Sequence, residues 1–147
     1  RWRAMKHRSL LNIKPDAVKR NLIGDILKRV ESARFTILAV TKVRLEREEA
    51  EAFYQEHRDK PFFKGLCTYI CSGPCVPVVL EKQDCVSELR TLVGATNPAE
   101  AAPGTIRREL GLDGRRNSVH ASDSPESALR EIHFFFSAHT LFLLSRD

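Results

Sequence analysis

Long apolar runs and a visible export signal are the first features that the sequence lacks. No hydrophobic segment approaches the roughly 20 residues that a membrane-spanning helix needs, and no secretory signal is visible. We therefore expect a cytoplasmic protein with no membrane partner. The common glycine-rich phosphate loops, G-x-x-x-x-G-K-[ST] and G-x-G-x-x-G, are also missing, so any phosphate would have to be held by individual side chains.

Cysteine is scarce and is not spaced as a metal or disulfide framework. The four cysteines never form a C-x-x-C pair, and no pair of histidines stands at zinc-finger distance. A disulfide framework would also be unusual in a chain without an export signal. We interpret the following residues as structural thiols: Cys67, Cys71, Cys75 and Cys85.

The composition is that of an ordinary globular domain with a basic surplus. The chain has 147 residues, of which 42% are hydrophobic and 29% are charged, with a net charge of +5. We expect residues 5–147 to form one domain and residues 1–4 to be upstream sequence, because Met5 resembles an initiator. The positive charge favours an anionic partner, either a polynucleotide or a small phosphate compound, but it is spread along the chain rather than gathered in a tail.

Hydrophobic periodicity predicts strands that alternate with helices. Apolar and β-branched runs indicate strands within 9–13, 35–45, 75–81 and 117–121. Apolar residues at helical spacing indicate helices within 19–33, 46–57, 61–70, 84–94 and 122–136. This order predicts an α+β fold of the ferredoxin-like βαββαβ type, with a four-stranded antiparallel sheet covered by helices.

Local signals refine three of these elements. Pro77 suggests that its strand is irregular or near an edge of the sheet. Gly94 is expected to close the preceding helix, and Ser124 followed by Pro125 is expected to begin the final one. Residues 95–117 show little regular pattern, and long irregular stretches inside compact domains are usually functional or disordered.

Several polar residues around this irregular stretch could together form an anion pocket. Arginine gives planar, bidentate contacts to phosphate oxygens and lysine gives a point charge. Taken singly, each such residue is more often an ordinary surface side chain. The candidates are Lys14, Arg90, Thr96, Arg107, Asn117 and His120.

Five sequence motifs resemble the nucleoside diphosphate kinase family. They are NIKPDAVKR, FYQEHRDKPFFKGL, YICSGP, LVGATNPAEAAPGTIR and RNSVHASDSPESALREI, in the family's order from about Ser9 to Phe136. The resemblance implies a ping-pong enzyme that moves the γ-phosphate of ATP, GTP or another nucleoside triphosphate to a nucleoside diphosphate, with broad base specificity. It also implies Mg²⁺, held mainly by the nucleotide phosphates rather than by protein ligands, and a homo-oligomer, either a tetramer or a hexamer.

By motif position, the resemblance assigns the catalytic roles. His120 would be the nucleophile that becomes phosphohistidine, since one imidazole nitrogen can attack while the other is held by an acceptor. Glu131 would be that acceptor, and Ser122 would help to orient it. Tyr54 would lie next to the histidine, and Lys14 would lie near the transferred phosphoryl group.

The resemblance also assigns the nucleotide-binding residues. Arg90, Thr96 and Arg107 would bind the phosphates. Lys14 and Asn117 would bind the sugar hydroxyls. Phe62 would stack on the base, a contact that every base can make.

The sequence departs from the family pattern near the base and next to the histidine. Ala121 stands where the family has glycine, and we expect strand-like backbone to accept the extra methyl group. Arg108 and Arg115 also replace glycines, and Gly114 stands where an apolar base-clamping residue is common. The family's C-terminal tyrosine–glutamate pair is missing from SAHTLFLLSRD. These changes bear on the base clamp, the loop shape and the subunit contacts rather than on phosphoryl transfer.

A binding or regulatory protein on the same fold is the alternative prediction. The basic charge would also permit nucleic-acid binding, but the predicted strands lack the paired aromatics on which RNA-binding sheets stack bases. We therefore do not expect a nucleic acid as the main partner. A homologue that has lost activity would be expected to lose the histidine or a phosphate-binding arginine, whereas this chain retains His120, Arg90 and Arg107.

Overall fold

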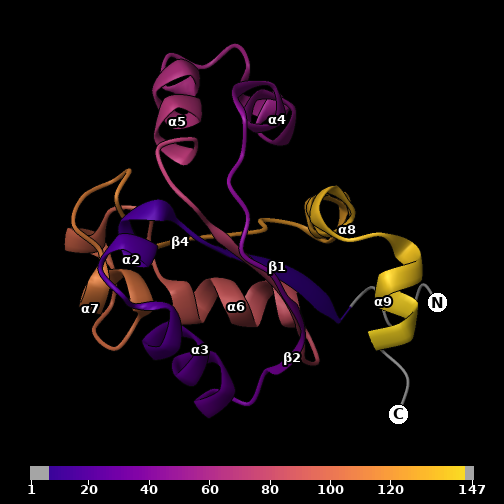
Figure 1. Cartoon of the computed structure of the whole chain (residues 1–147). Coiled ribbons are helices and arrows are strands. Elements are labelled where there is room, and N and C mark those ends of the chain that lie inside the picture. Colours follow the sequence, from indigo (N-terminus) through magenta and orange to yellow (C-terminus); the bar gives the residue numbers. More distant parts are fainter. Residues whose placement is uncertain (1–6, 145–147) are drawn as a thin grey trace.

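A four-stranded antiparallel sheet forms the centre of the protein, in the strand order β2-β3-β1-β4 (Figure 1). The computed structural model describes residues 7–144, so the predicted upstream residues 1–4 lie outside the described part. The sheet confirms the ferredoxin-like α+β prediction. Its strands are β1 (Arg8–Ile13), β2 (Thr36–Val40), β3 (Val76–Glu81) and β4 (Val119–Ala121).

One face of the sheet is covered by α3 (Ile23–Ser32) and α6 (Cys85–Val93). Alternate residues of β1 point to opposite faces, so Leu11 and Ile13 join this core while Leu10 joins the other. Helix α6 ends at Gly94, as expected, with a φ of 91° that glycine adopts without steric cost.

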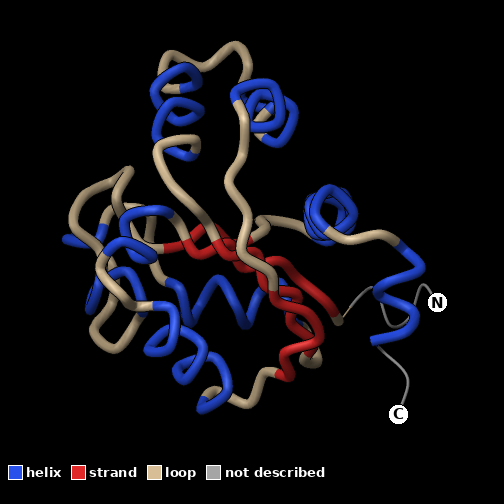
Figure 2. The backbone as a smooth tube through the Cα atoms, viewed as in Figure 1, coloured by secondary structure: helices blue, strands red, loops and turns tan. Residues whose placement is uncertain are grey.

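The other face is covered by helices from two separate parts of the chain. Between β2 and β3 the chain leaves the sheet as a helical hairpin and returns (Figure 2). After β4 the chain crosses to the same face. The elements on this face are α4 (Arg47–Phe53), the 3₁₀ helix η1 (Gln55–His57), α5 (Phe63–Ile70), α8 (Pro125–Phe135) and α9 (Ala138–Leu144).

The irregular stretch 95–117 contains short helices that periodicity did not predict. They are the 3₁₀ helix η2 (Pro98–Glu100) and α7 (Ile106–Leu110), and α2 (Pro15–Lys19) is a comparable one-turn helix after β1. Each of the first two begins with a side-chain cap: Asn97 Oδ1 accepts from Ala99 N and Thr105 Oγ1 accepts from Arg108 N. Helices this short do not show a repeating apolar pattern, so only their caps could have revealed them.

Two further boundaries differ from the sequence-based expectation. The predicted helix 46–57 ends at Phe53, and a turn at Tyr54 redirects the chain into η1. The helix begun by Ser124 and Pro125 is confirmed, but it is not the last one, since α9 follows a break at Phe136.

Pro77 lies in an interior strand, so the sheet-edge alternative is wrong. β3 pairs with β1 on one side and with β2 on the other. The carbonyl of Pro77 accepts a hydrogen bond of 3.2 Å from Thr41 N, one residue beyond β2. The N–H that proline lacks therefore faces the point where β2 has ended, which is why an interior strand accepts it.

No helix within residues 7–144 is long and apolar enough to cross a membrane. All four cysteines are free thiols, as predicted, and three of them are buried: Cys67, Cys75 and Cys85.

Candidate active site

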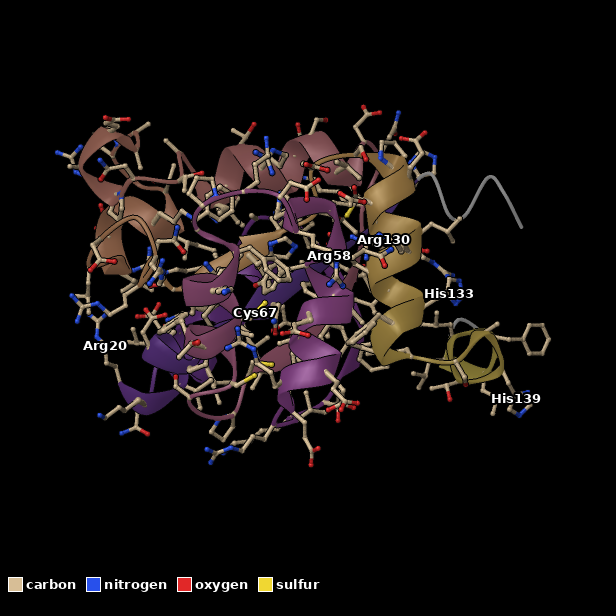
Figure 3. All side chains as sticks on the ribbon, turned by 90° about the horizontal axis from the view of Figure 1, so that it is seen from above. Arg20, Arg58, Cys67, Arg130, His133 and His139 are labelled. Atoms are coloured by element: carbon tan, nitrogen blue, oxygen red, sulfur yellow. The ribbon has the colours of Figure 1, made fainter. Side chains whose placement is uncertain are left out.

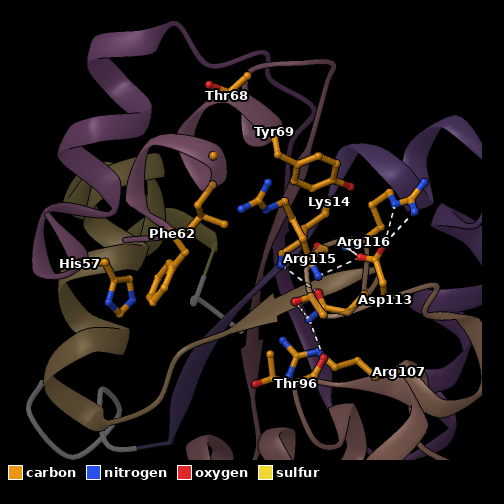
Figure 4. Close-up of a pocket in the computed structure, with 14 residues that line it drawn as sticks. Lys14, His57, Phe62, Thr68, Tyr69, Thr96, Arg107, Asp113, Arg115 and Arg116 are labelled. Carbon is orange, nitrogen blue, oxygen red and sulfur yellow. Dashed lines mark hydrogen bonds and ion pairs between the residues drawn. The ribbon is translucent and has the colours of Figure 1, made fainter. Parts of the chain in front are cut away.

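A cavity of about 1070 Å³ opens between α5, the start of α2 and the loop of residues 111–117 (Figure 4). Its walls bring together five of the six residues predicted to bind nucleotide: Lys14, Phe62, Thr96, Arg107 and Asn117. The sixth, Arg90, lies beside the cavity rather than in its wall, as do the predicted catalytic residues other than Lys14. The predicted set is therefore gathered in one region, with a cationic cavity next to the histidine.

The His120 imidazole on β4 is held from one side by buried oxygen atoms. Its Nε2 lies 2.8 Å from Glu131 Oε1, and Ser122 Oγ donates to the same oxygen at 2.7 Å. Burial would raise the pKa of Glu131, but the hydrogen bonds from His120 and Ser122 outweigh it and lower the pKa overall. Since an ionised carboxylate can only accept, Nε2 carries a proton, and in the neutral imidazole Nδ1 then has the free lone pair.

Arg130 ties the carboxylate of Glu131 to the helical hairpin. Its Nη2 lies 3.6 Å from Glu131 Oε2, the oxygen that the histidine does not use. From α8 (Figure 3) it also donates to the Phe53 carbonyl at the end of α4 and to Glu56 Oε1 in η1, each at 3.2 Å. These contacts fix Glu131 and therefore the direction of the imidazole.

The histidine packs against two aromatic rings of the same hairpin. Phe53 and Tyr54 meet it edge-on, with ring centroids 5.5 Å and 6.2 Å away. The Tyr54 hydroxyl is buried without a hydrogen-bond partner in the described structure, and burial raises its pKa above the usual range. It therefore stays protonated and has a free donor in the neighbourhood of His120.

Two arginines flank the strand that carries the histidine. Arg107 Nη2 donates to the Val119 carbonyl at 2.8 Å, and Arg90 Nη1 donates to the Ala121 carbonyl at 3.3 Å. Arg107 is buried, and burial, with the nearby Arg90 charge, lowers its pKa to about 10. No carboxylate within residues 7–144 pairs with Arg107. A buried guanidinium without a counter-ion is costly, so this arrangement suits an anionic ligand.

Lys14 is a second buried cation in the cavity wall. Its Nζ donates to Asn117 Oδ1 at 2.8 Å, and Asn117 in turn donates to the Thr96 carbonyl at 2.9 Å. Burial and the charge of Arg107 lower the pKa of Lys14 to about 8. The predicted sugar-binding pair is thus already assembled, with one polar group of each residue committed to the other.

Comparison with known proteins identifies this arrangement. The family model of nucleoside diphosphate kinase matches residues 7–141. The chain belongs to the nucleoside diphosphate kinase family. It is similar to the nucleoside diphosphate kinase of Pasteurella multocida, with 55% identity over 92% of this chain and 97% of that protein.

Solved structures of this family share the fold. The enzyme of Aquifex aeolicus has a TM-score of 0.89 at 42% identity, covering 91% of this chain and 97% of that one. The enzyme of Halobacterium salinarum, solved in complex with CDP, has a TM-score of 0.87 at 41% identity, covering 92% of this chain and 90% of that one. As a member of the nucleoside diphosphate kinase family, the chain is a phosphotransferase that acts on nucleotides.

Sequence reasoning missed a polar network behind the sugar-binding pair. The Tyr69 hydroxyl and the Ser118 N–H both donate to the carboxylate of Asp16. Ser118 has a φ of 77°, a left-handed conformation that is unusual for serine. Asp16 therefore holds a strained residue next to Asn117. The only available signal was that Asp16 and Tyr69 stand inside two of the family motifs.

Two of the departures from the nucleoside diphosphate kinase pattern, Gly114 and Arg115, lie at the outer end of the cavity, the end formed with Phe62. Arg115 and Gly114 line it together with Phe62, which is 45% exposed. Arg108 lies on α7 and donates to the Ala101 carbonyl at 2.9 Å, away from the cavity wall. Ala121 has ordinary strand backbone without a positive φ, so this position does not require glycine and accepts the methyl group without backbone strain.

Proposed function

We propose that this nucleoside diphosphate kinase works through a phosphohistidine on His120 in a ping-pong cycle. Nδ1 attacks the γ-phosphorus of a nucleoside triphosphate, forming an N–P bond as the bond to the β,γ-bridging oxygen breaks. The nucleoside diphosphate leaves, a second one enters, and its terminal oxygen takes the phosphoryl group by the reverse reaction. The observation that supports this most is the Nε2–Glu131 hydrogen bond of 2.8 Å, which leaves Nδ1 as the unprotonated nitrogen.

The surrounding side chains fit the charge changes that this cycle requires. The imidazole becomes cationic as the N–P bond forms, and Glu131, with its lowered pKa, offsets that charge. Arg107, Lys14 and Arg90 supply positive charge for the phosphates, with Thr96 beside them. Tyr54 has a free hydroxyl to donate near the migrating group.

The side chains that line the cavity suit Mg²⁺ that is bound by the nucleotide phosphates rather than by protein ligands. Lys14 and Arg107 line its inner part, while both oxygens of Asp113, a carboxylate in the wall, already accept from residues 115 and 116. Within residues 7–144 no cluster of three His, Cys, Asp or Glu side chains could hold a metal. When bound, Mg²⁺ neutralises phosphate charge, and phosphate oxygens are its usual ligands in such sites.

Broad base tolerance and self-association are further parts of the proposal. Phe62 offers a stacking face to any base, as does the aromatic platform of other tolerant sites. Self-association is supported by apolar surface at the sheet edge, where Val40 of β2 is 45% exposed and Phe142 of α9 is 65% exposed. Light scattering should give the mass of a tetramer or a hexamer; a monomer at micromolar concentration would contradict it.

Labelling with γ-³²P-ATP and Mg²⁺ tests the phosphohistidine directly. The wild type should acquire acid-labile label that chases onto added GDP, and His120→Ala should acquire none. His133→Ala is the matched control, since this exposed histidine lies on α8 and should not alter labelling (Figure 3). A wild type that binds nucleotide but takes no label would instead indicate a binding or regulatory protein.

A further inference from the structure

The side chain of Arg115 spans from the loop of residues 111–117 to α5 and lies within the nucleotide cavity (Figure 4). Its guanidinium rests on Gly65: a Cβ added there would lie 2.5 Å from Nη2 and 2.9 Å from Cζ. Only the missing side chain at Gly65 gives the guanidinium this place. The contact between Arg115 in the loop and Gly65 on the helix therefore places the guanidinium at one defined position inside the cavity.

The backbone that carries Arg115 is anchored from both sides. The N–H groups of Arg115 and Arg116 donate to Asp113 Oδ1 at 3.0 Å and 2.7 Å, and the Arg116 side chain donates to Oδ2 at 2.7 Å. On the other side, Lys14 Nζ donates to the Arg115 carbonyl at 3.4 Å. The loop therefore directs this side chain toward α5 instead of leaving it loose in solvent.

The N–H donors of the Arg115 guanidinium have no hydrogen-bond acceptor in the part of the chain that the structure describes. Within residues 7–144, the hydrogen bonds of Arg115 all involve its backbone. Phe62 is the N-cap of α5 and Gly65 lies in the first turn of that helix, three residues later. Figure 4 shows the Arg115 guanidinium away from the Phe62 ring, on the side of Tyr69, rather than over the face of the ring. A base stacked on Phe62 would present its edge, not its face, to these donors.

We propose that Arg115 reads the edge of the base and gives the enzyme a preference for guanine over adenine nucleotides. Guanine presents two adjacent acceptors, O6 and N7, which match the paired N–H donors of arginine, whereas adenine replaces the first with an amino donor. This preference is superimposed on the tolerance that stacking provides. The inference rests on the proposed function, since it needs a nucleotide in this cavity with its base on Phe62.

Equilibrium binding of GDP and ADP, measured by calorimetry, tests the inference without requiring turnover. The wild type should bind GDP about tenfold more tightly than ADP, at the lower end of what a bidentate arginine contributes. Arg115→Met keeps an unbranched apolar side chain but removes the charge and the donors, and should reduce that ratio to about twofold or less. Arg115→Lys keeps the charge without the paired donors and should reduce it similarly. Arg44→Met, at an exposed position outside the cavity wall, is the matched control and should leave the ratio unchanged.

A glycine pair tests the geometry separately from the charge. Gly65→Ala would push the guanidinium off α5 and should also reduce the ratio of the two affinities. Gly24→Ala introduces the same methyl group where no atom lies within 4 Å, and should preserve the ratio. Equal wild-type affinities for GDP and ADP, or an unchanged ratio in Arg115→Met, would overturn the role of Arg115 alone. Failure of the wild type to bind either nucleotide would overturn both the proposed function and the role of Arg115.

Discussion

The two ends of the nucleotide cavity are built in opposite ways. At the inner end, next to the histidine, the polar groups are almost fully buried: Lys14 is 6% exposed, Arg107 7% and Glu131 5%. Each of them has a hydrogen bond to a fixed partner. At the outer end, Phe62 is 45% exposed, and the Arg115 side chain has no hydrogen-bond acceptor within residues 7–144.

This difference explains where the chain can depart from its family. A buried charge is tolerated only with well-placed partners, so replacing any member of the inner end leaves another group unsatisfied. An exposed residue at the outer end loses only its own contacts. The departures at Gly114 and Arg115 accordingly lie at the outer end, whereas beside the histidine the sequence departs from the family motifs at Ala121 alone. Alterations at the inner end should therefore cost turnover, and alterations at the outer end should mainly change affinity.

Removing the Arg107 side chain should have the largest effect in this comparison. We expect Arg107→Ala to reduce kcat/KM by about 100-fold or more, as loss of one preorganised donor to transition-state charge does in other enzymes. Stability should fall as well, by about 1–3 kcal/mol, because the Gly94 and Val119 carbonyls lose their donor. Steady-state kinetics below the thermal transition and a melting curve would measure the two effects separately.

Arg108→Ala is the matched control for this experiment. Arg108 is the next residue of α7 and its side chain also donates to a backbone carbonyl, that of Ala101. It does not line the cavity, so its loss should cost some stability and little turnover. If both variants lost turnover equally, Arg107 would act by supporting the loop rather than by binding phosphate.

Arg107 also shows how far the sequence alone could lead. Its role was predicted from the motif in which it stands, but its helix was not, because α7 has only five residues and no apolar repeat. The strands were predictable from apolar, β-branched runs, and the long helices from the periodic face that each of them buries. The contact between Arg115 and Gly65 could not be predicted, because the two residues are fifty positions apart and the contact depends on the absence of a side chain at Gly65. The hidden network at Asp16 escaped for the same reason: its partners meet only in the folded chain.

Lys14 should make nucleotide binding at the inner end sensitive to pH. Its pKa of about 8 in the free protein lies below the usual value of 10.5, and bound phosphate should raise it. Binding above pH 8 therefore requires proton uptake, and the affinity for ADP should fall by up to tenfold per pH unit between 8 and 9.5. Calorimetric titrations across this range would measure the slope. In Lys14→Met the slope should flatten; an equally steep slope there would assign it to another group.

The effect of the same group on stability has the opposite sign. Because the pKa of Lys14 is lower in the folded chain than in the unfolded chain, the unfolded chain binds more protons between pH 8 and 10.5. The contribution of Lys14 to the free energy of unfolding therefore rises with pH in that window. Loss of affinity there cannot be attributed to destabilisation by this lysine.

Phe62 tests the outer end, where the effect should be smaller. Phe62→Ala removes the stacking face, which is worth about 1–3 kcal/mol per base in other proteins and should be near the lower limit at an exposed site. We expect KM to rise about fivefold while kcat stays within about twofold. Leu129→Ala is the control, with the same 45% exposure on α8 and no contact with the cavity. A large loss of kcat in Phe62→Ala would mean that base contacts drive the chemistry, and would erase the distinction between the two ends.

Ala121 offers the finest test of the inner end, since it is the single departure from the family beside the histidine. Its backbone is ordinary strand, paired with Leu11, and its carbonyl already accepts from Arg90. Restoring glycine by Ala121→Gly should therefore leave turnover within about twofold, while the added backbone freedom costs about 0.5–1 kcal/mol of stability. For a domain of this size the melting temperature should fall by about 2–4 °C per kcal/mol. A tenfold gain in turnover would show that the methyl group restrains the imidazole, and the inner end would then tolerate adjustment just as the outer end does.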